Sequence, residues 1–481
     1  MNTLRSSRRH FHTFQKFILA ILSILGFAIS LQAQQPSDIK ERLSAMSVCL
    51  YPDSLSLEKS SFQTSSIVAQ PLADEDISDT FDNVNDLEWL RPVAKNNKVV
   101  LFGEIHYHES IHFLRNRVLF ALNQFDSFPC LAIELQYSMS AFLDYYVSLQ
   151  SDNEARRFYT DVLYDFVTDE QFYQLLEHIR RWNNKFPGKR IHLVAYDIEH
   201  DYQTTLRNII LPYFRGIDSS FKIDIPSFIT LDFDSLLPEL RLRILRAKAV
   251  NHIGAFPFLT PVYIESVIDN LESLYNSQRF GMTFDYVRQR ALIRNLTDSR
   301  FLGKYFLNGK VMIFAGGYHT ATHVRFPDSA NFFREGSYFN YDFEPTKGKT
   351  FSIFARGYAL RFGPMSTVNL DSCLRQGGEY NGIVNTFQSA SREGLVSSDQ
   401  YYLIHWVFNP LDSLWFRLAY ANRHTPILIQ KIRWQELFAV AKTISTDEYN
   451  YARRVRDEIE RYDAYIIVPQ SNLIRARPKL R

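Results

Sequence analysis

The stretch 98–134 constrains the fold most, because two short apolar runs flank one long amphipathic segment. The first run, Lys98–Phe102, is rich in β-branched and aromatic residues and precedes Gly103, and the second run is Cys130–Ile133. Between them, apolar residues recur every three or four positions from 111 to 125, as on one face of a helix. We therefore predict a strand, a glycine turn, a helix and a second strand, which together form a βαβ unit.

Two further short apolar runs extend this pattern along the chain. They lie at 190–195 and 310–315, and segments with helical periodicity separate them. Because crossover helices join parallel strands, the predicted fold is α/β, with a central, mostly parallel sheet flanked by helices. The region of about 212–275 lacks clear strands, so we predict that it is a helical insertion into this fold.

The N-terminal segment differs in character from the rest of the chain. An apolar run at 17–31 precedes Ala33, a small residue suited to cleavage, and follows four basic residues, Arg5, Arg8, Arg9 and Lys16. This order is typical of a secretory signal peptide, with an uncleaved membrane anchor as the alternative. We therefore expect an exported protein, in the periplasm, the cell envelope or the medium, that meets a membrane only through an uncleaved signal segment.

The remaining chain divides by composition. Residues 34–85 are mixed and polar, and we predict that they form a linker after a signal peptide at 1–33. Residues 86–481 hold the predicted α/β domain. The 3 cysteines are too few for a disulfide framework, and Cys130 lies in a predicted buried strand, where a thiol serves as a small core residue.

Charge composition narrows the class of partner. The formal net charge is +2, and no basic run resembles a nucleic-acid patch, so we expect no DNA or RNA partner. No feature of the sequence indicates a partner protein. A small-molecule substrate is the partner that the polar residues described next suggest.

Acidic and imidazole side chains follow each of the four predicted strands. Glu104 and His106 come directly after the first strand, Glu134 after the second, Asp197 after the third and His319 after the fourth. Because ligands bind beyond the carboxyl ends of the strands in parallel α/β sheets, we expect these five side chains to share one site.

Such a set of side chains suits the activation of water. A histidine with an ordinary pKa near 6.5 accepts a proton at working pH, and nearby carboxylates hold its tautomer and stabilise the imidazolium. A second histidine can donate to an oxyanion or a leaving group. The spacing leaves an alternative open, in which a divalent metal ion is bound by Glu104, His106, Glu134 and His319.

A local motif offers a competing interpretation. His108-Glu109-Ser-Ile-His112 matches the His-Glu-x-x-His pattern of zinc metalloproteases, in which both histidines share one helical face. No further histidine follows within 113–118, where the longer metalloprotease signature requires one. The alternative roles of His112 are a partly exposed helix residue or a group that supports a site residue.

Taken in order, the same residues resemble the erythromycin esterase family. The motifs are scattered over about 95–480: Gly103-Glu-Ile-His106, a helix with Arg115, Ile133-Glu134, Tyr196-Asp197, Arg288 to Asn295, and Ala315-Gly-Gly-Tyr-His319. Pairs of Gly-x-x-His turns also mark a wider group that includes Tiki-type metalloproteases and ChaN-like haem-binding proteins. The first turn is one residue shorter than the Gly-Glu-x-x-His that is usual in the esterases.

This resemblance implies an α/β hydrolase in which the first-turn histidine activates water. By position, His106 is the base and His319 a second site histidine, and the supporting residues are Glu104, Glu134, Arg115 and Arg288. The hypothesis is thus an exported hydrolase that attacks an ester or related acyl bond of an unidentified small molecule, with no certain cofactor. The alternatives are a metal- or haem-binding protein and a metal-dependent protease of the same wider group.

Overall fold

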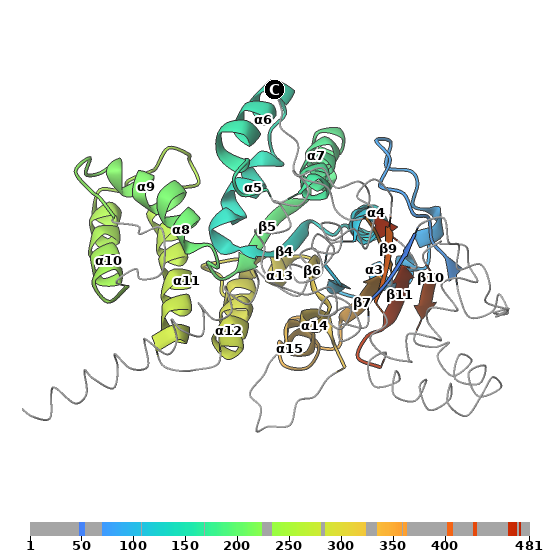
Figure 1. Ribbon diagram of the computed structural model, residues 1–481. Coiled ribbons are helices and arrows are strands. Elements are labelled where there is room, and N and C mark those ends of the chain that lie inside the picture. Colours follow the sequence, from blue (N-terminus) through green and yellow to red (C-terminus); the bar gives the residue numbers. More distant parts are fainter. Residues whose placement is uncertain are drawn as a thin grey trace, which may run out of the picture. The chain divides into compact units, whose positions relative to one another are not determined.

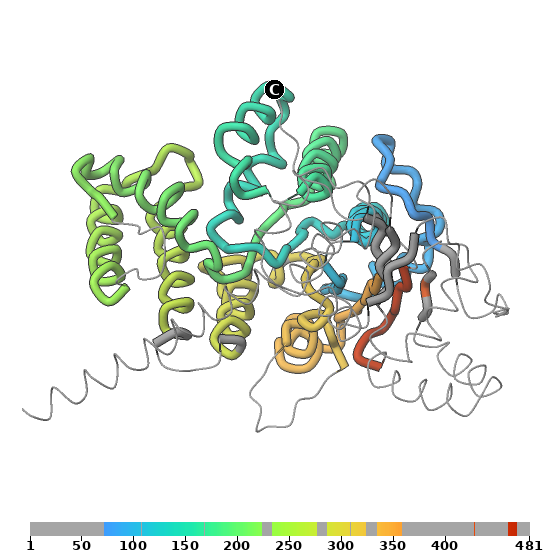
Figure 2. Tube along the Cα trace, in the orientation of Figure 1, coloured from blue at the N-terminus to red at the C-terminus, as the bar shows by residue number. Residues whose placement is uncertain are grey.

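In the computed structural model, the chain divides into two units, 1–53 with 363–408 and 54–362 with 409–481. The predicted signal peptide lies outside the described residues. Figure 2 follows the Cα trace. The described residues are 48–52, 70–106, 108–167, 169–223, 233–279, 284–323, 334–357, 359–362, 402–406, 427–430, 460–468 and 471–472.

The second unit is built on a largely parallel sheet. Its strand order is β2-β10-β11-β7-β3-β6-β4-β5, and all neighbours from β11 to β5 are parallel, whereas β10 is antiparallel to both β11 and β2. The strands are β2 (Gln70–Pro71), β3 (Val99–Glu104), β4 (Cys130–Gln136), β5 (His192–Asp197), β6 (Val311–Gly316), β7 (Thr350–Gly357), β10 (Ile427–Gln430) and β11 (Ala464–Val468). The predicted α/β fold with a central, mostly parallel sheet is therefore confirmed.

Shorter strand pairs complete the described β-structure. In the second unit, β8 (Ala359–Phe362) pairs in parallel with β12 (Ser471–Asn472). In the first unit, β1 (Val48–Pro52) pairs antiparallel with β9 (Tyr402–Trp406).

Helices cover both faces of the parallel sheet. In Figure 1, α5 to α7 lie on one side of β4 and β5, and α12, α14 and α15 lie on the other. The α-helices are α3 (Leu90–Asn96), α4 (Glu109–Asp126), α5 (Ser140–Tyr146), α6 (Asp152–Phe158), α7 (Glu170–Lys185), α8 (Tyr202–Thr205), α9 (Leu211–Arg215), α10 (Phe233–Ala249), α11 (Pro261–Arg279), α12 (Phe284–Thr297), α13 (Gly303–Asn308), α14 (Gly317–Thr320) and α15 (Glu335–Tyr341).

Short helical turns and the predicted insertion complete the unit. Where it is described, the region 212–275 contains α9, α10 and α11. Within the described residues, no helix has both the length and the apolar character needed to cross a membrane. The 3₁₀ turns are Asn85–Leu87, Tyr137–Met139 and Pro187–Lys189, and the π-helical turns are Tyr159–Leu163 and Leu206–Ile210.

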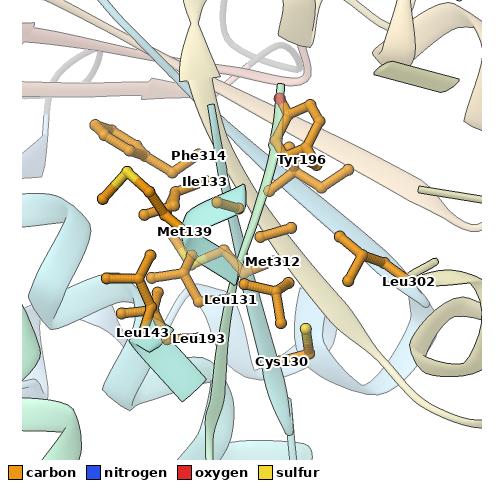
Figure 3. Packing of buried hydrophobic residues seen from close by; sticks show 14 of the residues in the cluster. Cys130, Leu131, Ile133, Met139, Leu143, Leu193, Tyr196, Leu302, Met312 and Phe314 are labelled. Atoms are coloured by element: carbon orange, nitrogen blue, oxygen red, sulfur yellow. The ribbon is translucent and has the colours of Figure 1, made fainter. Parts of the chain in front are cut away.

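The hydrophobic core lies where the central strands meet these helices. Every residue of β3 and β6 is buried, and both strands read as continuous apolar runs because helices cover both of their faces. Figure 3 shows Leu131 and Ile133 of β4 beside Met312 and Phe314 of β6. Full burial of each such side chain contributes about 1.5–3 kcal/mol to folding. Cys130 is a buried free thiol at the start of β4.

The predicted linker requires a correction at its C-terminal end. Apolar side chains of this segment are buried in the core, namely Leu72, Ile77, Phe81 and Val84. The ring of Phe81 packs against Phe120 of α4 and Trp182 of α7, at centroid distances of 4.9 and 5.1 Å. This part of 34–85 carries no helical or strand period, so its apolar residues gave no signal of burial, although they anchor the segment to the core.

Gly103, predicted above to form a turn, lies inside β3, which continues to Glu104. A Cβ on Gly103 would lie 2.1 Å from Oγ1 of Thr320 and 2.9 Å from Cα of Gly317. Glycine is required here because α14 approaches the strand closely, and not because the chain reverses. This close approach places α14 beside the end of β3.

Candidate active site

The first site pair forms where β3 ends. Glu104, the last residue of the strand, is 7% exposed, whereas the side chain of His106 is 58% exposed. Nδ1 of His106 donates to Oε1 of Glu104 at 3.0 Å. Desolvation of the ring works against its charged form, but Glu104 and Glu134 outweigh it and raise the pKa of His106. Burial raises the pKa of Glu104, and the bond to His106 opposes this effect.

Glu134 reaches the site through an irregularity in β4. The pairing of β4 with β5 shifts between Ile133 and Gln136, where β4 carries an extra residue relative to Ala195 and Asp197. Such a bulge bends the strand and redirects its side chains, which is a frequent device beside functional sites. The carboxylate of Glu134 thereby reaches across to β6, where Oε2 accepts from the backbone N–H of Gly316 at 2.7 Å.

Arg288 of α12 joins two of the predicted carboxylates. Its guanidinium donates to both oxygens of Asp197, at 3.0 and 2.6 Å, and to Oε1 of Glu134. Burial opposes the ionised form of both acids. Even so, bonds from His200 and Arg288 hold the pKa of Asp197 low, and His319 and Arg288 lower that of Glu134. Two nearly buried carboxylates therefore stay ionised around one cation.

His319, on α14 after β6, lies in an acidic and largely buried position. Its side chain is 10% exposed, and Nδ1 lies 3.1 Å from Oε2 of the fully buried Glu335. Nε2 lies 3.4 Å from Oε1 of Glu134, and the amide of Gln289 lies 2.9 Å from Nδ1. Desolvation lowers the pKa of His319, but Glu335 and Glu134 outweigh it and raise this pKa to about 9. The two glutamates therefore favour the imidazolium form of His319 at neutral pH.

His106 and Glu134 both approach Gly316. A Cβ on this glycine would lie 3.6 Å from Nε2 of His106 and 3.5 Å from Oε2 of Glu134. Glu134 in turn contacts His319. Contacts thus connect His106 to Glu104, Glu134 to His319, and Glu134 to Asp197 through Arg288.

Arg115, predicted to support the site, is buried in α4. It is 2% exposed in α4, and Nε and Nη2 donate to Oδ1 of Asn116 at 3.0 and 2.8 Å. Nη1 lies 3.3 Å from Nδ1 of His112, and the guanidinium covers the ring of Phe314 at 4.7 Å. Arg115 therefore contacts His112 and not the predicted carboxylates directly. Of the two roles that the sequence left open for His112, that of a partly exposed helix residue is wrong, because His112 is buried.

The donor set does not fit a divalent metal ion. Among the described residues, no cluster of three or more His, Cys, Asp or Glu side chains has the geometry of a metal site. Arg288 bonds to Glu134 and places Nη1 3.4 Å from Nε2 of His319, so a metal between these two groups would meet a guanidinium. No step of the chemistry below is therefore assigned to a metal.

The zinc-protease interpretation of 108–112 also fails on geometry. His108 precedes α4 as its N-cap residue, so it does not share a helical face with His112. It is fully buried, and a Cβ on Gly357 would lie 2.0 Å from its ring. Burial lowers the pKa of His108 to about 3. His112 directs its nitrogens to Arg115 and Glu104.

Sequence reasoning missed several residues that complete the site. Glu335 and Gln289 hold His319, and His200 contacts Asp197 through Nε2 at 3.0 Å. Gln289 follows Arg288 directly, which is the only sequence signal for it. Glu335 carries no signal, because it does not directly follow any predicted strand.

A separate cavity lies beside the edge strand β5 and has a volume of about 400 Å³. None of the predicted site residues lines it. Its walls include Tyr137, Asp144, Tyr145, Arg190, Lys304 and Tyr305. The predicted site residues therefore lie outside this cavity.

Comparisons with known proteins give only weak similarities. No protein-family model and no curated protein matches the sequence. Solved structures that are similar include a succinoglycan biosynthesis protein (14% identity, 85% of this chain and 95% of that chain covered, TM-score 0.49) and a protein from Bacillus cereus (12%, 93% and 100%, 0.49). A mutant of the erythromycin esterase EreC in its open conformation covers 80% of this chain and 94% of its own, with 13% identity and a TM-score of 0.42. These similarities are too weak to assign an activity, so the proposal below follows from this chain's own residues.

Proposed function

We propose that the protein hydrolyses an ester or a related acyl bond of a small molecule, with water activated by His106. The observation that carries this proposal is the pairing of an exposed imidazole with a buried carboxylate, His106 with Glu104. A carboxylate on Nδ1 fixes the tautomer in which Nε2 accepts a proton. The resemblance of the strand-end motifs to the erythromycin esterases agrees with this reaction class.

The base step uses His106 and Glu104. Nε2 of His106 takes a proton from water while the water oxygen bonds to the acyl carbon. The π electrons of the carbonyl move to its oxygen, which becomes an oxyanion. Glu104 stabilises the imidazolium that forms on His106. When the oxyanion collapses, the bond to the leaving alcohol breaks, and the imidazolium supplies the proton that the alcohol requires.

The positive groups opposite His106 stabilise the oxyanion. His319 is an imidazolium at neutral pH because Glu335 and Glu134 raise its pKa to about 9, which outweighs its desolvation. Arg288 adds a second cation beside it. Preorganised donors of this kind act where charge develops, and one such donor is commonly worth about 10²–10³ in kcat.

Substitution of the base tests the proposal. We expect His106→Asn to lower kcat/KM on a panel of p-nitrophenyl esters and chromogenic lactones by at least roughly 10²-fold. Asparagine retains a donor toward Glu104 but has no proton acceptor in the place of Nε2. The wild-type profile is expected to be bell-shaped, rising through the raised pKa of His106 and falling near pH 9 as His319 loses its proton.

The matched control is His192→Asn, because this histidine also donates from Nδ1 to a carboxylate, that of Asp144, but lies outside the site. The His192→Asn variant should retain wild-type turnover. The wild type and the His106→Asn variant are assayed with and without EDTA. Equal activity in wild type and His106→Asn, or activity that EDTA abolishes, would contradict the mechanism. A wild-type protein that hydrolyses none of the esters or lactones would contradict the proposed function.

A further inference from the structure

We propose that His112 is a positioning residue, which donates from Nε2 as a neutral imidazole to Glu104 and so orients the carboxylate that holds His106. The proposal rests on the function proposed above only in so far as His106 is the base. Its structural content, the direction of the hydrogen bonds around Glu104, is measurable without any substrate.

The tautomer of His112 follows from its neighbour. Nη1 of Arg115 lies 3.3 Å from Nδ1 of His112. A guanidinium has donors but no acceptor, so Nδ1 must accept, and the ring proton of the neutral imidazole lies on Nε2. Nε2 lies 3.4 Å from Oε2 of Glu104. The ring proton therefore lies on the nitrogen that is 3.4 Å from the second oxygen of the carboxylate that binds His106.

Glu104 requires a group in this place. Its Oε1 is engaged by His106 at 3.0 Å, whereas Oε2 is buried and has no well-formed hydrogen bond to any described residue. A buried carboxylate oxygen without a partner is costly. At 3.4 Å, the contact from Nε2 of His112 is longer than an ordinary hydrogen bond.

The surroundings keep the His112 ring neutral and fixed. Burial lowers its pKa well below the ordinary value, and the charges of Arg115, His106 and His108 act in the same direction. Its ring meets Phe314 edge-on, with centroids 5.8 Å apart. The two bonds from Arg115 to Asn116 hold the guanidinium against His112. The chain thus holds one orientation of the ring.

A neutral donor suits this position better than a cation. A cation at Oε2 would offset the charge of Glu104 and weaken its effect on His106. A neutral N–H instead fixes the direction of the carboxylate and leaves its charge acting on His106. The groups whose charges act on the ring of His106, namely Glu104 of β3, Glu134 of β4 and His319 of α14, stay unchanged in the variants below.

Two variants distinguish a hydrogen-bonding role of His112 from a role in packing alone. His112→Gln keeps an N–H donor near the place of Nε2, and His112→Met has a side chain of the same length as glutamine but without a donor.

The NMR experiment uses full-length protein with ¹³C,¹⁵N-labelled histidine. The His106 and His112 substitutions assign the resonances of these two residues. We expect His112 to show the Nε2–H tautomer and no titration from pH 5 to 9. We also expect the pKa of His106 to fall by about one unit in His112→Met and to stay near wild type in His112→Gln.

Enzyme kinetics provide a second test of the positioning role of His112. With an ester that the wild type hydrolyses, His112→Met should lose about tenfold in kcat with little change in KM, and His112→Gln should recover most of it. An Nδ1–H tautomer, a titrating His112, or equal His106 pKa values in the two variants would overturn the proposal. If the NMR results hold but no ester is hydrolysed, the positioning role stands and the proposed hydrolase function fails.

Discussion

At the scale of single residues, the two imidazoles of the site differ in exposure but both lie beside carboxylates. The side chain of His106 is 58% exposed and donates to Glu104, whereas that of His319 is 10% exposed and lies between Glu134 and Glu335. Nearby carboxylates raise the pKa of both rings, that of His319 to about 9. In the mechanism proposed above, the more exposed His106 exchanges a proton and the buried His319 stays charged.

Arg288 is the residue on which the ionised state of this site depends. We expect Arg288→Met to lower the free energy of unfolding at pH 7 by at least about 3 kcal/mol, because it leaves Glu134 and Asp197 as buried carboxylates without their cation. The loss should shrink toward pH 4, where protonation removes the uncompensated charge. Urea unfolding at both pH values measures this effect.

The control for this substitution lies on the same helix. Arg290 contacts the hydroxyl of Tyr286 on the exposed side of α12, so Arg290→Met should change the unfolding free energy by less than about 0.5 kcal/mol. A similar small change in Arg288→Met would show that the two carboxylates do not depend on the guanidinium.

At the scale of secondary-structure elements, the strand ends were predictable and the links between them were not. Glu104 and Asp197 are each the last residue of a strand, so an apolar run followed by a charged residue located both. The bulge that redirects Glu134 leaves no mark in the hydrophobic pattern, because one inserted residue has no period. Glu335 reaches His319 from a short helix, through packing that no local pattern describes.

Two misinterpretations have a similar physical cause. The His-Glu-x-x-His pattern requires both histidines on one helix, but α4 begins at Glu109, so His108 lies outside it. Phe81 is a core residue in a turn with φ of 61°, and a turn gives its apolar residues neither helical nor strand spacing. Sequence periodicity therefore locates regular elements well and irregular core segments poorly.

The contact between α14 and the sheet is an element-scale feature that can be tested. A Cβ on Gly317 would lie 2.1 Å from Cε2 of Phe354, whose ring stacks on Tyr462 at 4.8 Å. We expect Gly317→Ala to destabilise the protein by about 1–3 kcal/mol, because the stacked ring cannot move aside without loss of packing. It should also lower ester hydrolysis, since α14 carries His319. Thermal unfolding and the ester assay measure both effects.

Two further variants show whether the cause is steric. A Cβ on Gly188 would have nothing within 4 Å, so Gly188→Ala should leave both stability and activity near wild type. Adding Phe354→Leu to Gly317→Ala frees space and should recover part of the activity. Wild-type stability and activity in Gly317→Ala alone would show that a Cβ at this position does not conflict with the ring of Phe354.

At the scale of the whole molecule, the parallel sheet is what assembles the site. Strands β3, β4, β5 and β6 start far apart in the chain, yet parallel pairing sets their carboxyl ends along one edge. Helices α12 and α15 then supply Arg288 and Glu335. Because these ion pairs exist only when all of the elements are in place, the charge of His319 is linked to global folding.

This linkage predicts how the stability of the wild type depends on pH. The pKa of His319 is about 9 in the folded protein and about 6.5 in an unfolded chain, so its contribution is complete below pH 6.5 and is lost as the pH rises through 9. At about 1.4 kcal/mol per unit, it amounts to about 3 kcal/mol. Urea unfolding of wild type and His319→Gln should therefore show a stability difference that shrinks by about this amount between pH 6 and pH 9.5. Parallel pH dependences in the two proteins would mean that the His319 ion pairs add nothing to folding.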